Sequence, residues 1–161
     1  MTLKKLIATA VVLVSAHVLG SASPVSGQSA APADAERDVM AVVNALFDGM
    51  RKADSAKVRP LFHAQARLFA MDLRREGTPP RFDSVDEFLQ AIGRPRTEVY
   101  DERISNVKVM IDGSLASVWA DYTFHIGPRL SHCGVDHFLL VKESGRWQII
   151  ELADTRRTVN C

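Results

Sequence analysis

Two side chains near the C-terminus have the types and spacing of an acid–base pair. His137 and Asp154 fall on neighbouring strands of a predicted hairpin, where the expected pairing places the imidazole diagonally beside the carboxyl group. A carboxylate in contact with a histidine fixes the tautomer of the ring, which suits a general acid or base. Polar side chains on a mainly apolar face also fit a core hydrogen-bond network. The sequence leaves both interpretations open.

Five further side chains of the same predicted face are candidates for contact with a ligand. Tyr122 and Arg103 carry donors that could polarise a carbonyl group. Apolar contacts are expected from Phe124, Leu139 and Leu152. The sequence has no H-x-H or C-x-x-C spacing and no flavin motif, so we expect no bound metal and no cofactor.

The strands that carry these candidates are predicted from turn signals. From about residue 97 onward, apolar and polar residues alternate with period two, which is typical of strands. The alternation is broken at Asp112-Gly113, Gly127-Pro128 and Ser144-Gly145, dipeptides that favour hairpin turns. This pattern predicts a meander of four antiparallel strands. The face assignment above assumes turns centred on these dipeptides and no β-bulge between them.

Helices are predicted before the meander. Apolar residues between positions 39 and 50 recur at i, i+3, i+4 and i+7, which predicts one long amphipathic helix. A short helix is expected after residue 54, and Ser84 with Glu87 forms a capping box that begins a third helix. Helices followed by a run of strands predict an α+β domain, with helices on one face of a curved sheet.

The opposite face of the predicted sheet carries an aromatic patch. Trp119 and Phe138 are expected to pair across two strands there. An apolar patch of this kind could join two copies of the chain or dock another partner, and ordinary partial exposure is the alternative.

The first 27 residues have the pattern of a signal peptide. Lys4 and Lys5 precede the apolar run Leu6–Leu19, and the small, polar stretch Gly20–Gly27 follows it. The run is shorter than the roughly 20 apolar residues of a membrane span, so we expect cleavage rather than a retained anchor. The mature protein is then secreted or periplasmic, without stable membrane insertion. Residues 28–33 are predicted to be a flexible leader, and residues 34–161 to be the domain.

Composition limits the class of protein. The chain has 161 residues, of which 47% are hydrophobic, and its 20 basic side chains balance 19 acidic ones. These values predict one folded domain and argue against a disordered chain or an electrostatic nucleic-acid binder. Both cysteines, Cys133 and Cys161, lie in the part expected to be exported, where a disulfide between them is the preferred interpretation. Free thiols or intermolecular pairing are the alternatives.

Several stretches resemble nuclear transport factor 2-like domains. The run Ala53–Ala66, with Leu61-Phe62-His63 inside it, resembles the part of such domains that follows the first helix. The stretches Gly134–Val141, Gly145–Ile149 and Asp154–Arg157 are similar to the SnoaL-like and lumazine-binding branches. The resemblance covers residues from about 34 to 157. It implies a cone-shaped, cystatin-like α+β fold, in which a strongly bent antiparallel sheet wraps around a long N-terminal helix and encloses an apolar pocket.

The resemblance leaves three functional hypotheses. The leading one is an exported protein that binds a small apolar or aromatic molecule in the pocket. The second is an isomerase, cyclase or dehydratase, in which His137 and Asp154 would move protons; no second carboxylic acid is predicted beside Tyr122 to match a steroid-isomerase oxyanion hole. The third is a module that forms homodimers or docks a partner through Trp119 and Phe138.

Overall fold

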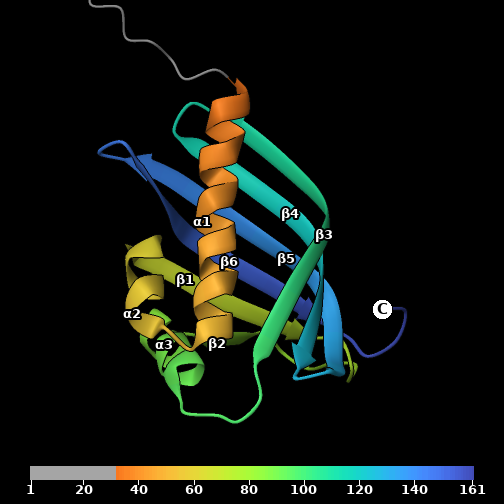
Figure 1. Cartoon of the computed structure of the whole chain (residues 1–161). Helices are drawn as coiled ribbons and strands as arrows, with labels where there is room; N and C mark the ends of the chain where they lie inside the picture. Colours follow the sequence, from red (N-terminus) through yellow and green to blue (C-terminus); the bar gives the residue numbers. More distant parts are fainter. Residues whose placement is uncertain (1–31) are drawn as a thin grey trace, which may run out of the picture.

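A long helix, α1 (Pro32–Lys52), lies against one face of a six-stranded curved sheet (Figure 1). This computed structural model describes residues 32–161, so the predicted signal peptide and most of the predicted leader lie outside the described residues. The remaining elements are α2 (Ser55–Val58), a 3-10 helix (Arg59–Leu61), β1 (Phe62–Asp72), β2 (Arg81–Asp83), α3 (Val85–Gly93), β3 (Tyr100–Asp112), β4 (Leu115–Ile126), β5 (Arg129–Glu143) and β6 (Arg146–Arg156).

The helices follow the local signals of the sequence. In α1, the apolar stripe that includes Val39, Leu46 and Met50 is buried, as the i, i+3, i+4 spacing predicts. The helix begins at Pro32 and ends at Lys52. The capping box of α3 is confirmed, because Ser84 accepts from the backbone of Glu87 while the Glu87 side chain accepts from Ser84.

The strand order of the sheet is β2-β1-β6-β5-β4-β3. The four meander strands β3–β6 pair antiparallel as predicted, and β1 with β6 is the one parallel pair of the described sheet. No hairpin turn links β1 to β6, and the chain between them makes a long excursion through α3 and the meander. Such a connection permits parallel pairing, whereas a tight turn does not.

Three β-bulges interrupt the meander. In β3 the register shifts between Ser105 and Lys108, where Asn106 has a φ of 51°. In the β4–β5 pair Ser131 has no partner, and in the β5–β6 pair Ile150 has none. Each extra residue turns the following side chains to the other face of the sheet.

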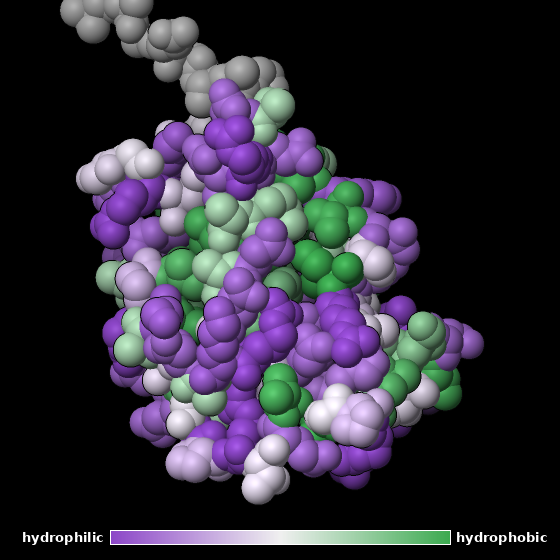
Figure 2. Space-filling model, in the orientation of Figure 1, coloured by the Kyte–Doolittle hydropathy of each residue, from purple (hydrophilic) through white to green (hydrophobic). Residues whose placement is uncertain are grey.

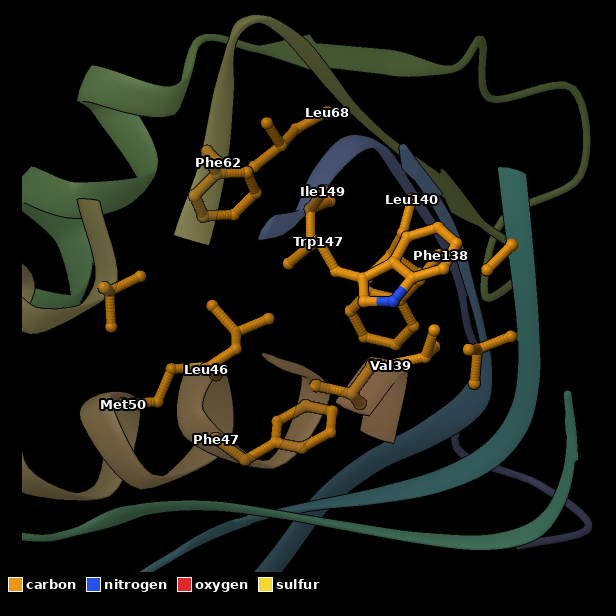
Figure 3. Close-up of a cluster of buried hydrophobic side chains, with 14 of the residues drawn as sticks. Val39, Leu46, Phe47, Met50, Phe62, Leu68, Phe138, Leu140, Trp147 and Ile149 are labelled. Carbon is orange, nitrogen blue, oxygen red and sulfur yellow. The ribbon is translucent and has the colours of Figure 1, made fainter. Parts of the chain in front are cut away.

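The bulge at Ser131 reverses the predicted faces of β5. Phe138 and Leu140 point toward α1 with Ile149 of β6, and together they form the core (Figure 3). The Phe138 ring meets the Phe47 ring edge to face, with 6.0 Å between centroids. Phe138 is 0% exposed, so the predicted surface pair with Trp119 is wrong. Trp119 is 48% exposed on the outer face and lies beside His137 instead.

The predicted disulfide between Cys133 and Cys161 is confirmed, with 5.6 Å between the two Cα atoms. Cys133 is buried, and its backbone N–H and carbonyl bond to those of Arg157. The end of the chain is therefore held against the outer face of β5.

Most side chains on the face that carries α1 are hydrophilic, and hydrophobic ones gather beside the upper half of this helix (Figure 2). None of the helices between residues 32 and 161 combines the length and the apolar character needed to cross a membrane.

Candidate functional site

A cavity of about 230 Å³ lies between the helices and the sheet. Its apolar lining comes from α1, α3 and four strands: Leu46, Phe47, Met50, Phe88, Ala91, Ile92, Tyr100, Phe124, Phe138 and Leu152. Its polar lining is Arg81, Glu102, Tyr122, His132, Asp136, Asp154 and Arg156. The helices contribute only apolar side chains, so every polar group of the cavity comes from the sheet.

Two acids from different strands share the buried end of the cavity. Asp136 of β5 is 2% exposed, and no N–H or hydroxyl group of the described residues donates to its Oδ2 atom. Burial raises the pKa of the Asp136 carboxyl well above its ordinary value, and the nearby charge and hydrogen bond of Glu102 add to this rise. Burial also raises the pKa of Glu102 to about 7. The two carboxyls therefore share a proton at neutral pH, which Asp136 holds, and Glu102 binds a second proton as the pH falls below about 7.

The third acid, Asp154, is paired with an arginine on its own strand. The Arg156 guanidinium donates from Nε to Asp154 Oδ2 over 2.7 Å and from Nη2 to Oδ1 over 3.2 Å. Burial alone would lower the pKa of Arg156, but the hydrogen bond and charge of Asp154 raise it above its ordinary value. Arg156 and Asp154 therefore form a bidentate ion pair, in which both hydrogen bonds of the guanidinium go to the Asp154 carboxylate.

Two aromatic side chains border the acids. The Tyr122 hydroxyl donates to the backbone carbonyl of Thr155 over 2.9 Å, and burial raises the pKa of this phenol. Burial lowers the pKa of His132 to about 4, so its ring is neutral at pH 7. The His132 ring packs against those of Tyr122 and Phe124, with centroids 5.7 and 4.9 Å away.

Strand alternation brings these groups to one face. Asp136 lies directly opposite Asp154 in the β5–β6 pairing, and Gly134 lies opposite Tyr122 in the β4–β5 pairing. A side chain at Gly134 would approach the Tyr122 ring to 2.8 Å, so the absence of one leaves room for this ring.

Four of the seven predicted site residues line this cavity: Tyr122, Phe124, Leu152 and Asp154. Their predicted roles in binding stay predictions. Glu102 and Asp136, which the sequence did not place beside Tyr122, line the same cavity, and their charges raise the pKa of its phenol.

The other three predicted residues lie elsewhere. His137 is on the outer face, where its Nε2 atom lies 2.9 Å from the Ser117 hydroxyl oxygen, so the predicted pair with Asp154 is not formed. Arg103 points outward and pairs with Asp101 over 2.7 Å. Leu139 lines a shallow groove on the outer face with Glu151. The bulge in β3 displaces Arg103, and the bulge at Ser131 displaces His137 and Leu139.

Sequence reasoning missed Glu102, His132, Asp136 and Arg156. Glu102 comes to the inner face because of the bulge at Asn106, and asparagine inside a strand pattern is a signal for it, since this residue tolerates positive φ. Asp136 and His132 come inward because of the bulge at Ser131, for which the sequence offers no comparable signal.

The cavity is not arranged as a metal centre. Within residues 32–161 no group of three or more His, Cys, Asp or Glu side chains could hold a metal ion. The arrangement instead offers hydrogen bonds and a shared proton to the polar group of an organic molecule.

The shared proton makes stability depend on pH. Because the pKa of Glu102 is raised from 4.5 to about 7, the folded state keeps a proton that the unfolded state releases, and stability falls as pH rises through this interval. The double variant Glu102→Gln/Asp136→Asn has no titrating carboxyl at these two positions, so its stability should not fall over this pH interval. Its free energy of unfolding should gain about 2 kcal/mol relative to the parent between about pH 5 and 6.5 from Glu102 alone, and the raised pKa of Asp136 adds to this gain.

Urea unfolding at several pH values measures this difference. His132 acts in the opposite direction, because its lowered pKa makes the folded state bind fewer protons than the unfolded state, but it is present in both proteins and cancels. The exposed Glu98→Gln variant is the control, and its curve should run parallel to that of the parent. A pH-independent difference for the double variant would contradict the shared proton.

Comparison with known proteins identifies the family. The family described as "Putative lumazine-binding" matches residues 34–152. No curated protein matches the chain. Three solved structures have the same fold, and all are below 25% identity, so they bear on the fold alone.

The first is an NTF2-like (nuclear transport factor 2-like) protein of unknown function from Shewanella baltica OS155, with 19% identity and a TM-score of 0.64 over 81% of this chain and 99% of that chain. The second is a putative dehydratase of the NTF2-like family from Streptomyces avermitilis, with 15% identity and a TM-score of 0.62 over 80% and 100%. The third is an NTF2-like protein with a cystatin-like fold from Novosphingobium aromaticivorans, with 6% identity and a TM-score of 0.63 over 80% and 86%. With the family match over residues 34–152, the chain belongs to the putative lumazine-binding family, and its cone-like α+β fold is the one seen in NTF2-like structures.

Proposed function

We propose that this domain binds a small, largely apolar or aromatic molecule in the cavity between α1, α3 and the sheet. The observation that carries the proposal is the combination of apolar walls with a buried polar end. A cavity of about 150 Å³ can hold benzene, so one of about 230 Å³ has room for one or two rings.

The family name supports a ligand of this size, since lumazine is a compound of two fused rings. We also propose that the protein acts after export. The signal-peptide pattern of residues 1–27 and the disulfide support this location, because disulfides persist in oxidising compartments.

Filling the cavity from α3 tests the binding proposal. Ala91 lines the cavity and is itself exposed, so Ala91→Trp places a large ring in the ligand space without disturbing the buried core. We expect ligands found in a thermal-shift screen of aromatic compounds to stabilise the parent, and to bind this variant about tenfold more weakly or worse. Isothermal titration calorimetry measures the affinities.

The matched control is Gln90→Trp, at the neighbouring exposed position that does not line the cavity. It should bind the same compounds as the parent does. Equal binding by the parent and Ala91→Trp would show that the compounds bind elsewhere, and a screen without any stabilising compound would overturn the proposal.

The acid pair favours a second candidate function, which is proton transfer on the bound molecule. The pKa of Glu102 is near 7, and a general acid or base works best when its pKa is near the operating pH. The name of the similar structure from Streptomyces avermitilis, "putative dehydratase", is compatible with such chemistry. Mass spectrometry of stabilising compounds after incubation tests this candidate, which fails if none is converted by the parent.

A further inference from the structure

We propose that the molecule bound in this cavity carries a basic nitrogen, which binds as a cation between the carboxyl groups of Glu102 and Asp136. The inference rests on the proposed function and names the chemical class of its ligand: a one- or two-ring aromatic or alicyclic amine. It is carried by the charges of the lining residues, by an unsatisfied buried oxygen and by the shape of the apolar walls.

The lining has more acids than available cations. Arg156 is committed to Asp154 by two hydrogen bonds, and Arg81 is largely exposed and pairs with Asp83 over 2.7 Å. Among the described residues, no salt bridge joins Glu102 or Asp136 to a basic side chain. The described residues therefore supply these two carboxyls with no salt-bridge partner of their own.

The groups that face Glu102 and Asp136 from the other elements add no unpaired positive charge to the lining. They are the neutral His132 ring of β5, the un-ionised Tyr122 phenol of β4 and the Asp154–Arg156 ion pair of β6. The lining residues from α1 and α3 carry no charge. A cation entering from the apolar side thus meets attraction from the pair and no unpaired positive charge.

Asp136 also has an unsatisfied acceptor. Its side chain is almost fully buried, and its Oδ2 atom receives no hydrogen bond from an N–H or hydroxyl group of the described residues. Buried polar atoms are nearly always hydrogen-bonded in folded proteins, so an orphan in a cavity wall indicates a donor supplied by a ligand. An ammonium group offers several N–H donors and a charge.

The proton of Glu102 takes the place of this cation in the free protein below about pH 7. Burial raises the pKa of both groups, because two desolvated carboxylates without a counter-ion are costly. An ammonium that enters would balance the charge of an ionised Glu102, while Asp136 keeps its own proton. Below about pH 7, binding of the amine therefore releases the proton of Glu102 to solvent.

The walls fit the apolar part of such a molecule. Phe138 follows Asp136 by two residues on the same face of β5, so an aromatic ring lies next to the carboxyl. Phe47 of α1 packs on Phe138 from the opposite side of the cavity lining. A ring attached to a short aminoalkyl chain can contact these side chains while its nitrogen reaches the acid pair.

The test compares probes of equal shape and different charge. The first set is tryptamine, the alcohol tryptophol and indole-3-acetate, and the second is phenethylamine, 2-phenylethanol and phenylacetate. We expect the amine of each set to bind about tenfold more tightly than its alcohol, or better, and the carboxylate to bind most weakly. Calorimetry measures the affinities for the full protein.

The pH dependence separates the amine from a neutral acceptor. Amine affinity should rise about tenfold between about pH 5.5 and 7.5, because binding below about pH 7 releases the proton of Glu102, and calorimetry in buffers of different ionisation enthalpy should detect this proton. A carbonyl or hydroxyl acceptor would instead use the proton as a hydrogen-bond donor, and its affinity would fall over the same interval.

Variants identify the pair as the site. Glu102→Gln/Asp136→Asn should remove both the preference for the amines over the alcohols and the rise of amine affinity with pH. Glu98→Gln, at an exposed position just before the same strand, should keep the full preference. The probe series on the parent protein decides the question even if the double variant does not fold.

Alcohols that bind as tightly as amines, or affinities that fall with rising pH, would overturn the inference and leave the proposed function intact. Absence of binding by every probe and by every compound of the aromatic screen would overturn both.

Discussion

Replacing Gly134 with alanine is expected to lower the free energy of unfolding by about 3 kcal/mol or more, because it overpacks the sheet at the polar end of the cavity. A Cβ atom at this position would overlap the carbonyl oxygen of Thr155, which belongs to the backbone of β6 and cannot rotate away. It would also press on the Tyr122 ring. The strands β5 and β6 would have to separate to admit the methyl group.

This separation should reach the candidate site. The carbonyl of Thr155 accepts the hydrogen bond from Tyr122, and Thr155 stands between Asp154 and Arg156. We therefore expect Gly134→Ala to weaken ligand binding as well as stability. Urea unfolding followed by circular dichroism measures the stability, and calorimetry with a compound from the aromatic screen measures the binding.

The matched control is Gly93→Ala at the end of α3. The nearest atom to its added Cβ is the Ser55 hydroxyl oxygen at 2.9 Å, the end of a side chain that can rotate. This variant should change stability by less than about 1 kcal/mol. If Gly134→Ala were as stable as Gly93→Ala, the close approach of β6 to Gly134 would be wrong.

Removing the disulfide is expected to have an effect of similar size. Cys161→Ala should lower the free energy of unfolding by about 3–4 kcal/mol, because the bond joins residues 28 positions apart and restricts the unfolded chain. Cys133 is kept in this variant, since it is buried and packs as a small apolar side chain. Urea unfolding under oxidising conditions measures the loss.

A reducing agent provides the control for this prediction. It should destabilise the parent by about the same amount and leave Cys161→Ala unchanged. Equal unfolding midpoints of the oxidised parent and the variant would contradict a stabilising role for the bond.

The sequence is informative where structure depends on near neighbours. The stripe of α1, the capping box at Ser84 and the hairpin dipeptides each need only a few adjacent residues, and all three signals lead to the observed elements. The disulfide was predictable because the chain has only two cysteines in the part expected to be exported.

The sequence is less informative about which face of a strand is buried. Side chains alternate between the two faces of a strand, so the face of each residue is predicted by its distance from the turn. One bulge inserts an extra residue and reverses the predicted faces for the rest of the strand. The bulge at Ser131 turns Asp136 inward and His137 outward. The bulge at Ile150 adds one more residue, so the side chains of β6 after it return to their predicted faces. Asp154 therefore lies on the predicted inner face, whereas its expected partner, His137, lies on the outer face.

The parallel pairing of β1 with β6 has a consequence for the order of folding. Phe62 of β1 lies beside Ile149 of β6, and Phe138 and Ile149 cover part of the apolar stripe of α1, so β1 and α1 lack these partners until the last strands have been synthesised. Contacts between such distant segments form late, because a long loop must close first. A growing chain that lacks residues 146–156 can pair β1 only with the three-residue strand β2, and completion of β6 sets the moment at which the cavity first has all its walls.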